Sequence, residues 1–125
     1  MKRDMDLVRK ILFAMEEDEN QTSMHAESLP KIDGYNENQI LYHIKLMAQA
    51  ALIHIDQIEV PTFQDQKFIY DSYSISWNGH EFLDAARDTQ RWEKAKGAMS
   101  KAGGLVLPVL MQLLTSYLKA ELKLP

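Results

Sequence analysis

The chain has 125 residues, 18 of them acidic and 14 basic, and it contains no cysteine. This length fits one domain of about 100 to 200 residues, and the absence of cysteine excludes thiol catalysis, disulfides and thiolate metal sites. Its longest apolar stretch, residues 105–114, is shorter than the ~20 residues of a transmembrane helix. We therefore expect a cytoplasmic protein with no membrane span.

The charge is divided between two parts of the chain. Residues 1–90 hold 16 acidic and eight basic residues, whereas residues 91–125 hold two acidic and six basic residues. An acidic body disfavours sequence-independent binding to nucleic acid, because lysine and arginine supply most of that attraction. The basic end of the chain keeps DNA binding open as an alternative.

The first predicted element is an amphipathic helix that begins after Asp4, a favourable N-cap residue. The polar segment that follows it, up to Gly34, allows at most a short strand at residues 29–32. Apolar side chains at helical spacing define the inward face of the helix: Val8, Ile11, Leu12 and Met15.

A second helix is predicted to begin after Asn36. Gln39 completes a capping box with Asn36, and Tyr35 and Ile40 occupy the hydrophobic-staple positions. Helical periodicity divides the rest of the segment into two faces. The inward face would carry Ile40, Ile44, Met47, Ala48 and Ala51, and the outward face His43, Lys45 and Gln49.

A two-stranded hairpin is predicted next, with strands at residues 52–60 and 72–77 and a turn at residues 61–67. The apolar alternation of the first strand changes phase at Gln57, which predicts a bulge or a break there. In the returning strand the alternation predicts one buried and one exposed face. Tyr73, Ile75 and Trp77 would be buried, and Ser72, Ser74 and Ser76 would face solvent.

A third helix is predicted after the hairpin, with Asn78 as N-cap, Glu81 at N3 and Trp77 stapled against Phe82. It would continue past Trp92 to Met99, with Arg87, Arg91 and Lys94 exposed, until Gly103 and Gly104 interrupt it. An apolar helix follows, in which Pro108 lies in the first turn. We therefore expect a domain at residues 1–100 and a separate C-terminal helix at residues 101–125.

This order of elements is typical of an α+β winged helix-turn-helix domain with a two-stranded wing and an extra C-terminal helix. The chain also resembles a family of uncharacterised bacterial and prophage proteins classified as a domain of unknown function. The resemblance rests on Met1–Leu7, on Tyr42–Ile53, and on Trp77–Asp84 with the Ala-Ala-Arg-Asp that follows it. It implies a mobile-element association and no known activity. Ala51 stands where winged-helix proteins often have glycine, which makes a left-handed helix stop less favourable.

No motif in the sequence predicts catalysis, a metal site or a cofactor. His25, His43, His54 and His80 lack metal-ligand spacing, and Glu81 beside His80 already has a capping role. The serines of the returning strand lack a nucleophile-elbow motif, and the glycines lack the spacing of a phosphate-binding loop. We therefore expect a binding protein rather than an enzyme.

The predicted reading helix and wing are acidic, which favours a protein partner over DNA. Residues 34–80 contain two basic and five acidic residues, whereas a groove-reading surface usually presents several cationic groups. A DNA-binding regulator is the alternative. The candidate partner-binding residues are Tyr42, His43, Lys45 and Gln49 on the second helix and Phe63, Gln64, Asp65 and Lys67 on the wing; phosphate contacts in the DNA alternative are Arg87, Arg91, Lys94 and Lys96.

The C-terminal helix is more apolar than the edge of a small domain requires. Three interpretations remain open: a homodimer interface, packing against the rest of the chain, and binding to a membrane surface. The candidate self-association residues are Leu107, Leu110, Leu114, Tyr117 and Leu118.

Overall fold

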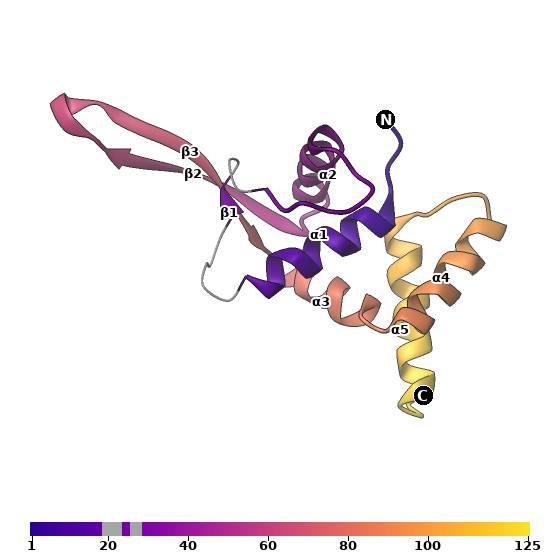
Figure 1. Ribbon diagram of the computed structural model, residues 1–125. Helices are drawn as coiled ribbons and strands as arrows, with labels where there is room; N and C mark the ends of the chain where they lie inside the picture. Colours follow the sequence, from indigo (N-terminus) through magenta and orange to yellow (C-terminus); the bar gives the residue numbers. More distant parts are fainter. Residues whose placement is uncertain (19–23, 26–28) are drawn as a thin grey trace. The chain divides into compact units, whose positions relative to one another are not determined.

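The computed structural model describes residues 1–18, 24–25 and 29–125. Its class is α+β, as expected, and it divides into two compact units, Met1–His80 and Glu81–Pro125 (Figure 1). The boundary between these units lies within helix α3 (Trp77–Ala86). The segment after the hairpin forms two helices, and the second of them packs against the C-terminal helix.

Helix α1 (Met5–Glu17) has the predicted N-cap and the predicted inward face. One carboxylate oxygen of Asp4, Oδ1, accepts hydrogen bonds from the backbone N–H groups of Asp6 at 2.9 Å and Leu7 at 3.2 Å. These bonds satisfy donors that the first turn of a helix otherwise leaves unpaired. The four apolar side chains predicted to face inward, Val8, Ile11, Leu12 and Met15, are buried.

Helix α2 (Glu37–Gln49) begins with the predicted capping box, in which Asn36 and Gln39 exchange hydrogen bonds of 2.8 Å. Its inward residues Ile40, Ile44 and Met47 are buried, and α2 packs against α1. The helix ends through Ala51, which has a φ of 60°. The left-handed stop therefore forms despite the Cβ of alanine. The Leu52 N–H group donates to the Met47 carbonyl oxygen at 2.9 Å and completes it.

The sheet has the strand order β1-β3-β2, with β1 at Met24–His25, β2 at Ile53–Pro61 and β3 at Lys67–Ile75. Strands β2 and β3 pair continuously, from Ile53 opposite Ile75 to Pro61 opposite Lys67. The predicted bulge at Gln57 is therefore wrong. The short strand expected at residues 29–32 is also wrong, because those residues form no strand.

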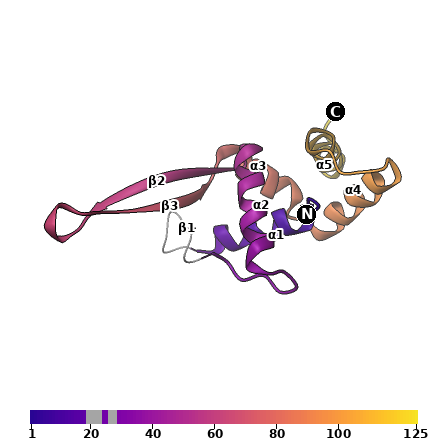
Figure 2. The ribbon, with the colours of Figure 1, turned by 90° about the horizontal axis from the view of Figure 1, so that it is seen from above.

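The tip of the hairpin lies within the predicted turn. A single helical turn, η2 (Phe63–Asp65), connects the strands, and Thr62 closes it by donating its N–H group to the Gln66 carbonyl oxygen at 2.8 Å. The hairpin extends as a long arm away from α1 and α2 (Figure 2). We call its outer part, residues 56–71, the wing.

The end of β3 departs from the predicted pattern because Ser76 has a structural role. Ser76 is buried; its Oγ donates to the Ala51 carbonyl oxygen at 2.5 Å and accepts from the Gly79 N–H group at 3.0 Å. Ser76, rather than Asn78, therefore caps α3. The predicted exposure of Ser72 and Ser76 is wrong, and so is the burial of Trp77 against Phe82, because the Trp77 side chain is 78% exposed.

In the second unit, the single long helix predicted after the hairpin is wrong. Helix α3 ends at Ala86, and α4 (Thr89–Lys101) begins anew because the Asp88 carboxylate accepts from the Arg91 N–H group at 2.8 Å. The rings of Phe82 and Trp92 are both fully buried and meet edge to face at 5.9 Å. The predicted break after α4 is confirmed, with Gly103 at a φ of 95°.

The C-terminal helix α5 (Leu107–Glu121) has Pro108 in its first turn, as predicted. It packs against α4, and its residues Leu110 and Leu114 are fully buried. Among the described residues, no helix is long and apolar enough to cross a bilayer.

Candidate interaction surface

The candidates on α2 separate into exposed and buried residues. Tyr42, Lys45 and Gln49 are exposed, whereas His43 is only 2% exposed, so the expected exposure of His43 is wrong. The His43 Nδ1 lies 2.8 Å from the Gln39 carbonyl oxygen, which can only accept; Nδ1 therefore carries a proton. The other ring nitrogen, Nε2, accepts the backbone N–H group of Asp4 at 2.8 Å. His43 thus anchors the start of α1.

Tyr35 joins the same network from the segment before α2. Its hydroxyl donates to the second carboxylate oxygen of Asp4, Oδ2, at 2.8 Å. This hydrogen bond, together with desolvation and the negative charge of Asp4, raises the pKa of Tyr35 to about 12. The Asp4, Tyr35 and His43 cluster is therefore a structural connection between α1 and α2.

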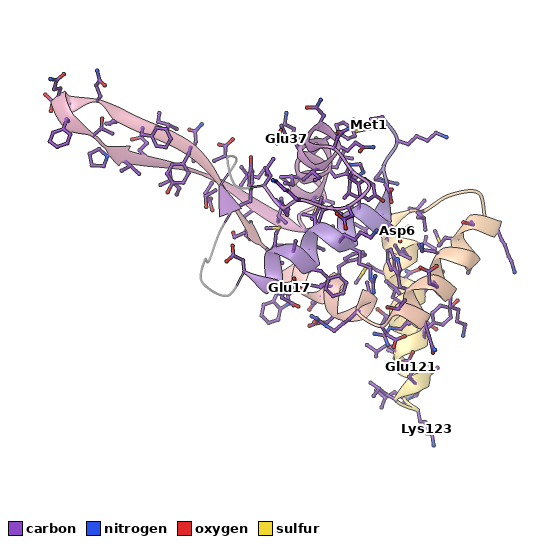
Figure 3. All side chains as sticks on the ribbon, in the orientation of Figure 1. Met1, Asp6, Glu17, Glu37, Glu121 and Lys123 are labelled. Carbon is purple, nitrogen blue, oxygen red and sulfur yellow. The ribbon has the colours of Figure 1, made fainter. Side chains whose placement is uncertain are left out.

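The wing exposes apolar side chains that the sequence analysis did not select. Directly paired residues lie on the same face of a hairpin, so the pairs Ile58–Tyr70 and Val60–Phe68 share one face. The rings of Phe68 and Tyr70 lie 5.8 Å apart, and Phe68 is 49% exposed. We call these four residues the apolar face of the wing; Figure 3 shows side chains standing out from the hairpin along its length.

At the base of the hairpin the buried apolar residues lie on the other face. Ile53 and Tyr73 are 2% and 4% exposed, and Ile75 is partly buried. Residue parity assigns all three to the face opposite Ile58 and Val60. The change of apolar phase at Gln57 therefore marks a change of face in an unbroken strand. This phase change was the sequence signal that could have identified the apolar face of the wing.

The remaining wing candidates lie at the tip or beside it. Phe63 is 94% exposed, and Gln64 and Asp65 follow it in the tip, with left-handed φ angles of 66° and 59°. Lys67 begins β3, and its Nζ lies 3.5 Å from a carboxylate oxygen of Glu59. The hairpin strands and tip, residues 53–75, hold four acidic residues against this one lysine: Asp56, Glu59, Asp65 and Asp71.

The outer edge of β2 presents backbone groups that no strand of the described chain pairs with. In an antiparallel pair, the backbone N–H and C=O groups of every second residue bond to the partner strand, and those of the residues between them point away from it. Ser76 donates to Leu52 at one end of the hairpin and Thr62 donates to Gln66 at the other. Every second residue between these two ends therefore bonds to β3. The residues between them, which include Ile55, Gln57 and Glu59, direct their N–H and C=O groups outward.

The cationic candidates in the second unit already have partners within the chain. The Arg91 side chain is buried, so its predicted exposure is wrong: it donates to the Ala85 and Asp84 carbonyl oxygens at 2.7 and 3.3 Å and to the Glu121 carboxylate at 2.7 Å. The other three are also engaged. Arg87 lies 2.9 Å from Asp84, the Lys96 ammonium lies 3.3 Å from Glu93, and the Lys94 ammonium lies 4.3 Å from the centre of the Tyr117 ring.

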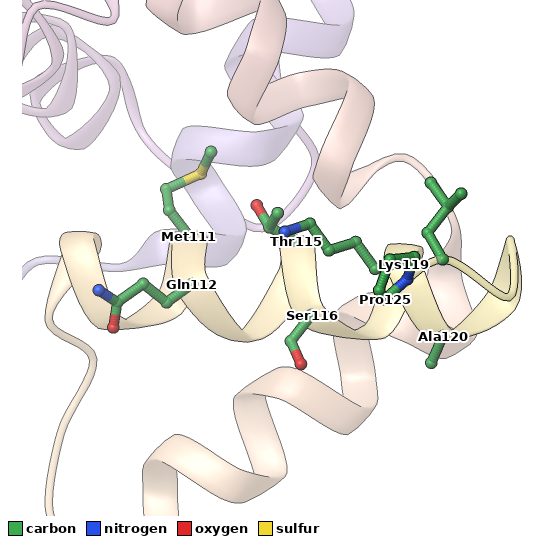
Figure 4. A pocket seen from close by; sticks show the side chains of 8 residues that line it. Met111, Gln112, Thr115, Ser116, Lys119, Ala120 and Pro125 are labelled. Atoms are coloured by element: carbon green, nitrogen blue, oxygen red, sulfur yellow. The ribbon is translucent and has the colours of Figure 1, made fainter.

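On α5, burial divides the five candidate self-association residues. Packing within the chain accounts for the fully buried Leu110 and Leu114, whereas Leu107, Tyr117 and Leu118 are partly exposed. A hollow of about 650 Å³ lies along the same helix, between Met111 and the final residue, Pro125 (Figure 4). Self-association through the partly exposed residues stays a prediction.

Within residues 1–18 and 29–125, no group of three or more histidine, aspartate or glutamate side chains is placed to hold a metal ion. His80 and Glu81 are exposed on α3. The two buried residues among the candidates for chemistry have structural roles, since Ser76 caps a helix and His43 anchors the start of α1.

The chain belongs to the family described as Hypothetical protein (DUF2513), whose model matches residues 2–105. It is also 32% identical over 114 residues to an uncharacterised protein of Haemophilus influenzae, an alignment that covers 90% of this chain and 91% of that protein. No solved structure matches the chain. The resemblance to a family of unknown function noted from the sequence is thereby confirmed.

Proposed function

We propose that this chain is a non-catalytic, winged-helix-like binding protein that acts through protein–protein contacts. The apolar face of the wing, in which Val60 and Phe68 are exposed and Ile58 and Tyr70 are half-buried, is the observation that carries this proposal. Ile58, Val60, Phe68 and Tyr70 form a contiguous apolar strip on an arm that projects away from α1 and α2. Such strips on a protein surface are typical of binding sites.

The strand order and the charge of the wing support the two parts of the proposal. The order β1-β3-β2, with α2 directly before the hairpin, matches a winged-helix arrangement. Four carboxylates in the hairpin disfavour contact with phosphates and are compatible with a cationic protein surface. The mobile-element association implied by the family resemblance makes a host or defence factor the kind of partner we propose.

Photocrosslinking from the wing tip tests this function. Phe63 is replaced by benzoylphenylalanine and the full chain is irradiated in the cells that make it. We expect a covalent adduct with one protein, and no such adduct when the same residue replaces the exposed Lys101. Equal labelling from both positions, or an adduct with nucleic acid alone, would contradict the proposal.

A DNA-binding regulator is a second candidate, favoured by the position of α2 before the wing and its exposed Lys45 and Gln49. If it is correct, the chain binds mixed duplex DNA with an affinity that falls steeply as salt increases, and Lys45→Glu weakens that binding. Under the protein-binding proposal we expect no duplex binding even at low salt. Light scattering of the same sample gives the mass and tests for a homodimer.

A further inference from the structure

The outer edge of β2 offers backbone groups to a binding partner, and the two faces of the wing offer side chains of different character. The edge offers the backbone N–H and C=O groups of Ile55, Gln57 and Glu59 in the extended spacing that an added strand needs. Glu59 and Asp71 lie on the face opposite the apolar face of the wing, together with Ile69 and Lys67, and Asp56 lies on the side of the apolar face. A strand added at this edge would thus place alternate side chains beside Ile58 and Val60 on one face and beside Glu59 on the other.

We propose that β2 binds a partner protein by strand addition, and that the bound segment alternates apolar and basic residues. This inference rests on the proposed function, because it names the kind of segment that the wing binds. The apolar residues of the segment extend the strip formed by Ile58, Val60, Phe68 and Tyr70. Its basic residues lie on the side of Glu59 and Asp71.

Charge favours this occupant over a second copy of the chain or a nucleic acid. The β2 edge of another copy would bring Asp56 and Glu59 and no lysine or arginine, so pairing two β2 strands would add negative charge to negative charge. A phosphate backbone would be repelled for the same reason. A cationic segment is attracted by every uncompensated carboxylate of the hairpin.

The test uses a synthetic peptide of about ten residues, a usual upper length for a strand, in which lysine and valine alternate. Binding to the full chain is measured by fluorescence anisotropy. Gln57→Pro removes one outward N–H group and places the proline ring on the edge. Proline is tolerated at edge positions of a strand, and Pro61 already occupies the same register in β2.

We expect Gln57→Pro to weaken binding by at least about tenfold, the worth of one hydrogen bond at the upper end of its range. Gln57→Ala, which keeps the backbone donor, should bind as the parent chain does. The double charge reversal Glu59→Lys and Asp71→Lys should weaken the lysine–valine peptide and strengthen a glutamate–valine peptide. This second variant decides the question if Gln57→Pro unfolds the hairpin.

Three results would overturn strand addition. The first is no binding of the alternating peptide to the parent chain, and the second is equal binding of a peptide with its lysines and valines in separate blocks. The third is a parent chain that is dimeric while Gln57→Pro is monomeric, since the edge would then serve a second copy. A protein adduct from position 63 alongside any of these would leave the proposed function standing and remove only this inference.

Discussion

The two ends of the β2–β3 hairpin are built from the same paired strands but are stabilised differently. At the base, Ile53 and Tyr73 are buried in the core of the first unit, whereas in the wing Phe68 and Val60 are 49% and 40% exposed. Burial of apolar area stabilises the base, and cross-strand pairs such as Val60–Phe68 must stabilise the wing. The apolar residues at the base are thus required for folding, whereas the apolar residues of the wing are not buried by the fold.

Truncating one aromatic residue at each end of the hairpin tests this difference in stabilisation most directly. Tyr73→Ala should lower the free energy of unfolding by about 3 to 5 kcal/mol, as large-to-small changes in a core do. Phe68→Ala should lower it by less than about 1 kcal/mol. Urea unfolding of both variants measures the difference, and equal losses would mean that the wing is part of the core.

The join between the hairpin base and α3 should tolerate no added side chain. A Cβ at Gly79 would lie 2.0 Å from the Leu52 carbonyl oxygen and 2.8 Å from Cγ2 of Ile75. Gly79→Ala should therefore destabilise the chain by about 3 kcal/mol, the upper end for overpacking. Gly97→Ala in α4 is the control, because a Cβ there meets nothing within 4 Å; thermal unfolding should show a gain of about 0.5 to 1 kcal/mol.

The anchor between α1 and α2 tests how much a buried hydrogen bond contributes to the stability of the first unit. His43→Ala leaves the Asp4 N–H group without its acceptor and should lower the free energy of unfolding by about 2 kcal/mol. Lys45→Ala, two residues away and exposed, should change it by less than about 0.5 kcal/mol. Similar values for the two variants in chemical denaturation would show that the buried network contributes little.

The left-handed stop after α2 predicts a gain in stability. Ala51 has a φ of 60°, a conformation that costs an L-residue roughly 1 kcal/mol, so Ala51→Gly should stabilise the chain by about 0.5 to 1 kcal/mol. Ala50→Gly is the matched control, because Ala50 has an ordinary φ of −85°. It should not stabilise the chain, and a gain from both variants in thermal unfolding would exclude the proposed strain.

The smallest expected effect appears only at high pH. The pKa of Tyr35 rises from 10.0 to about 12 in the folded chain, chiefly through its hydrogen bond to Asp4. A raised pKa means that the neutral hydroxyl is stabilised by folding, so this contribution is present below pH 10 and is lost as the pH rises toward about 12. Tyr35→Phe should flatten the stability profile in that window; tyrosinate absorbance reports the titration itself.

Local signals predicted the starts of α1 and α2, because Asp4 and the Asn36–Gln39 pair make their caps within a few residues. They failed where two nearby caps competed. Ser76 caps α3 in place of Asn78 because its hydroxyl also reaches Ala51, 25 residues away in sequence, and no local pattern reports such a contact. The continuous apolar spacing after the hairpin predicts one helix, whereas the Asp88 cap begins a second one.

The exposure of the wing tip and of Tyr42, Lys45 and Gln49 on α2 was predicted correctly, whereas their role in binding stays a prediction. His43 could not be distinguished from its exposed neighbours, because its burial depends on an acceptor role toward a residue 39 positions away. The apolar face of the wing was misread for a different reason. A change in apolar parity has two physical causes, a bulge and a change of face, and only the register of the paired strand distinguishes them.

The Asp4–His43 hydrogen bond also has a consequence for the order in which the chain can fold. Synthesis delivers α1 to the ribosomal exit long before it delivers α2, so α1 emerges with its cap in place and its anchor still absent. An amphipathic helix of this length is marginal when it stands alone in water. The first unit therefore cannot fold stepwise from its N-terminus. Helix α1 becomes stable only after the chain has been synthesised past His43.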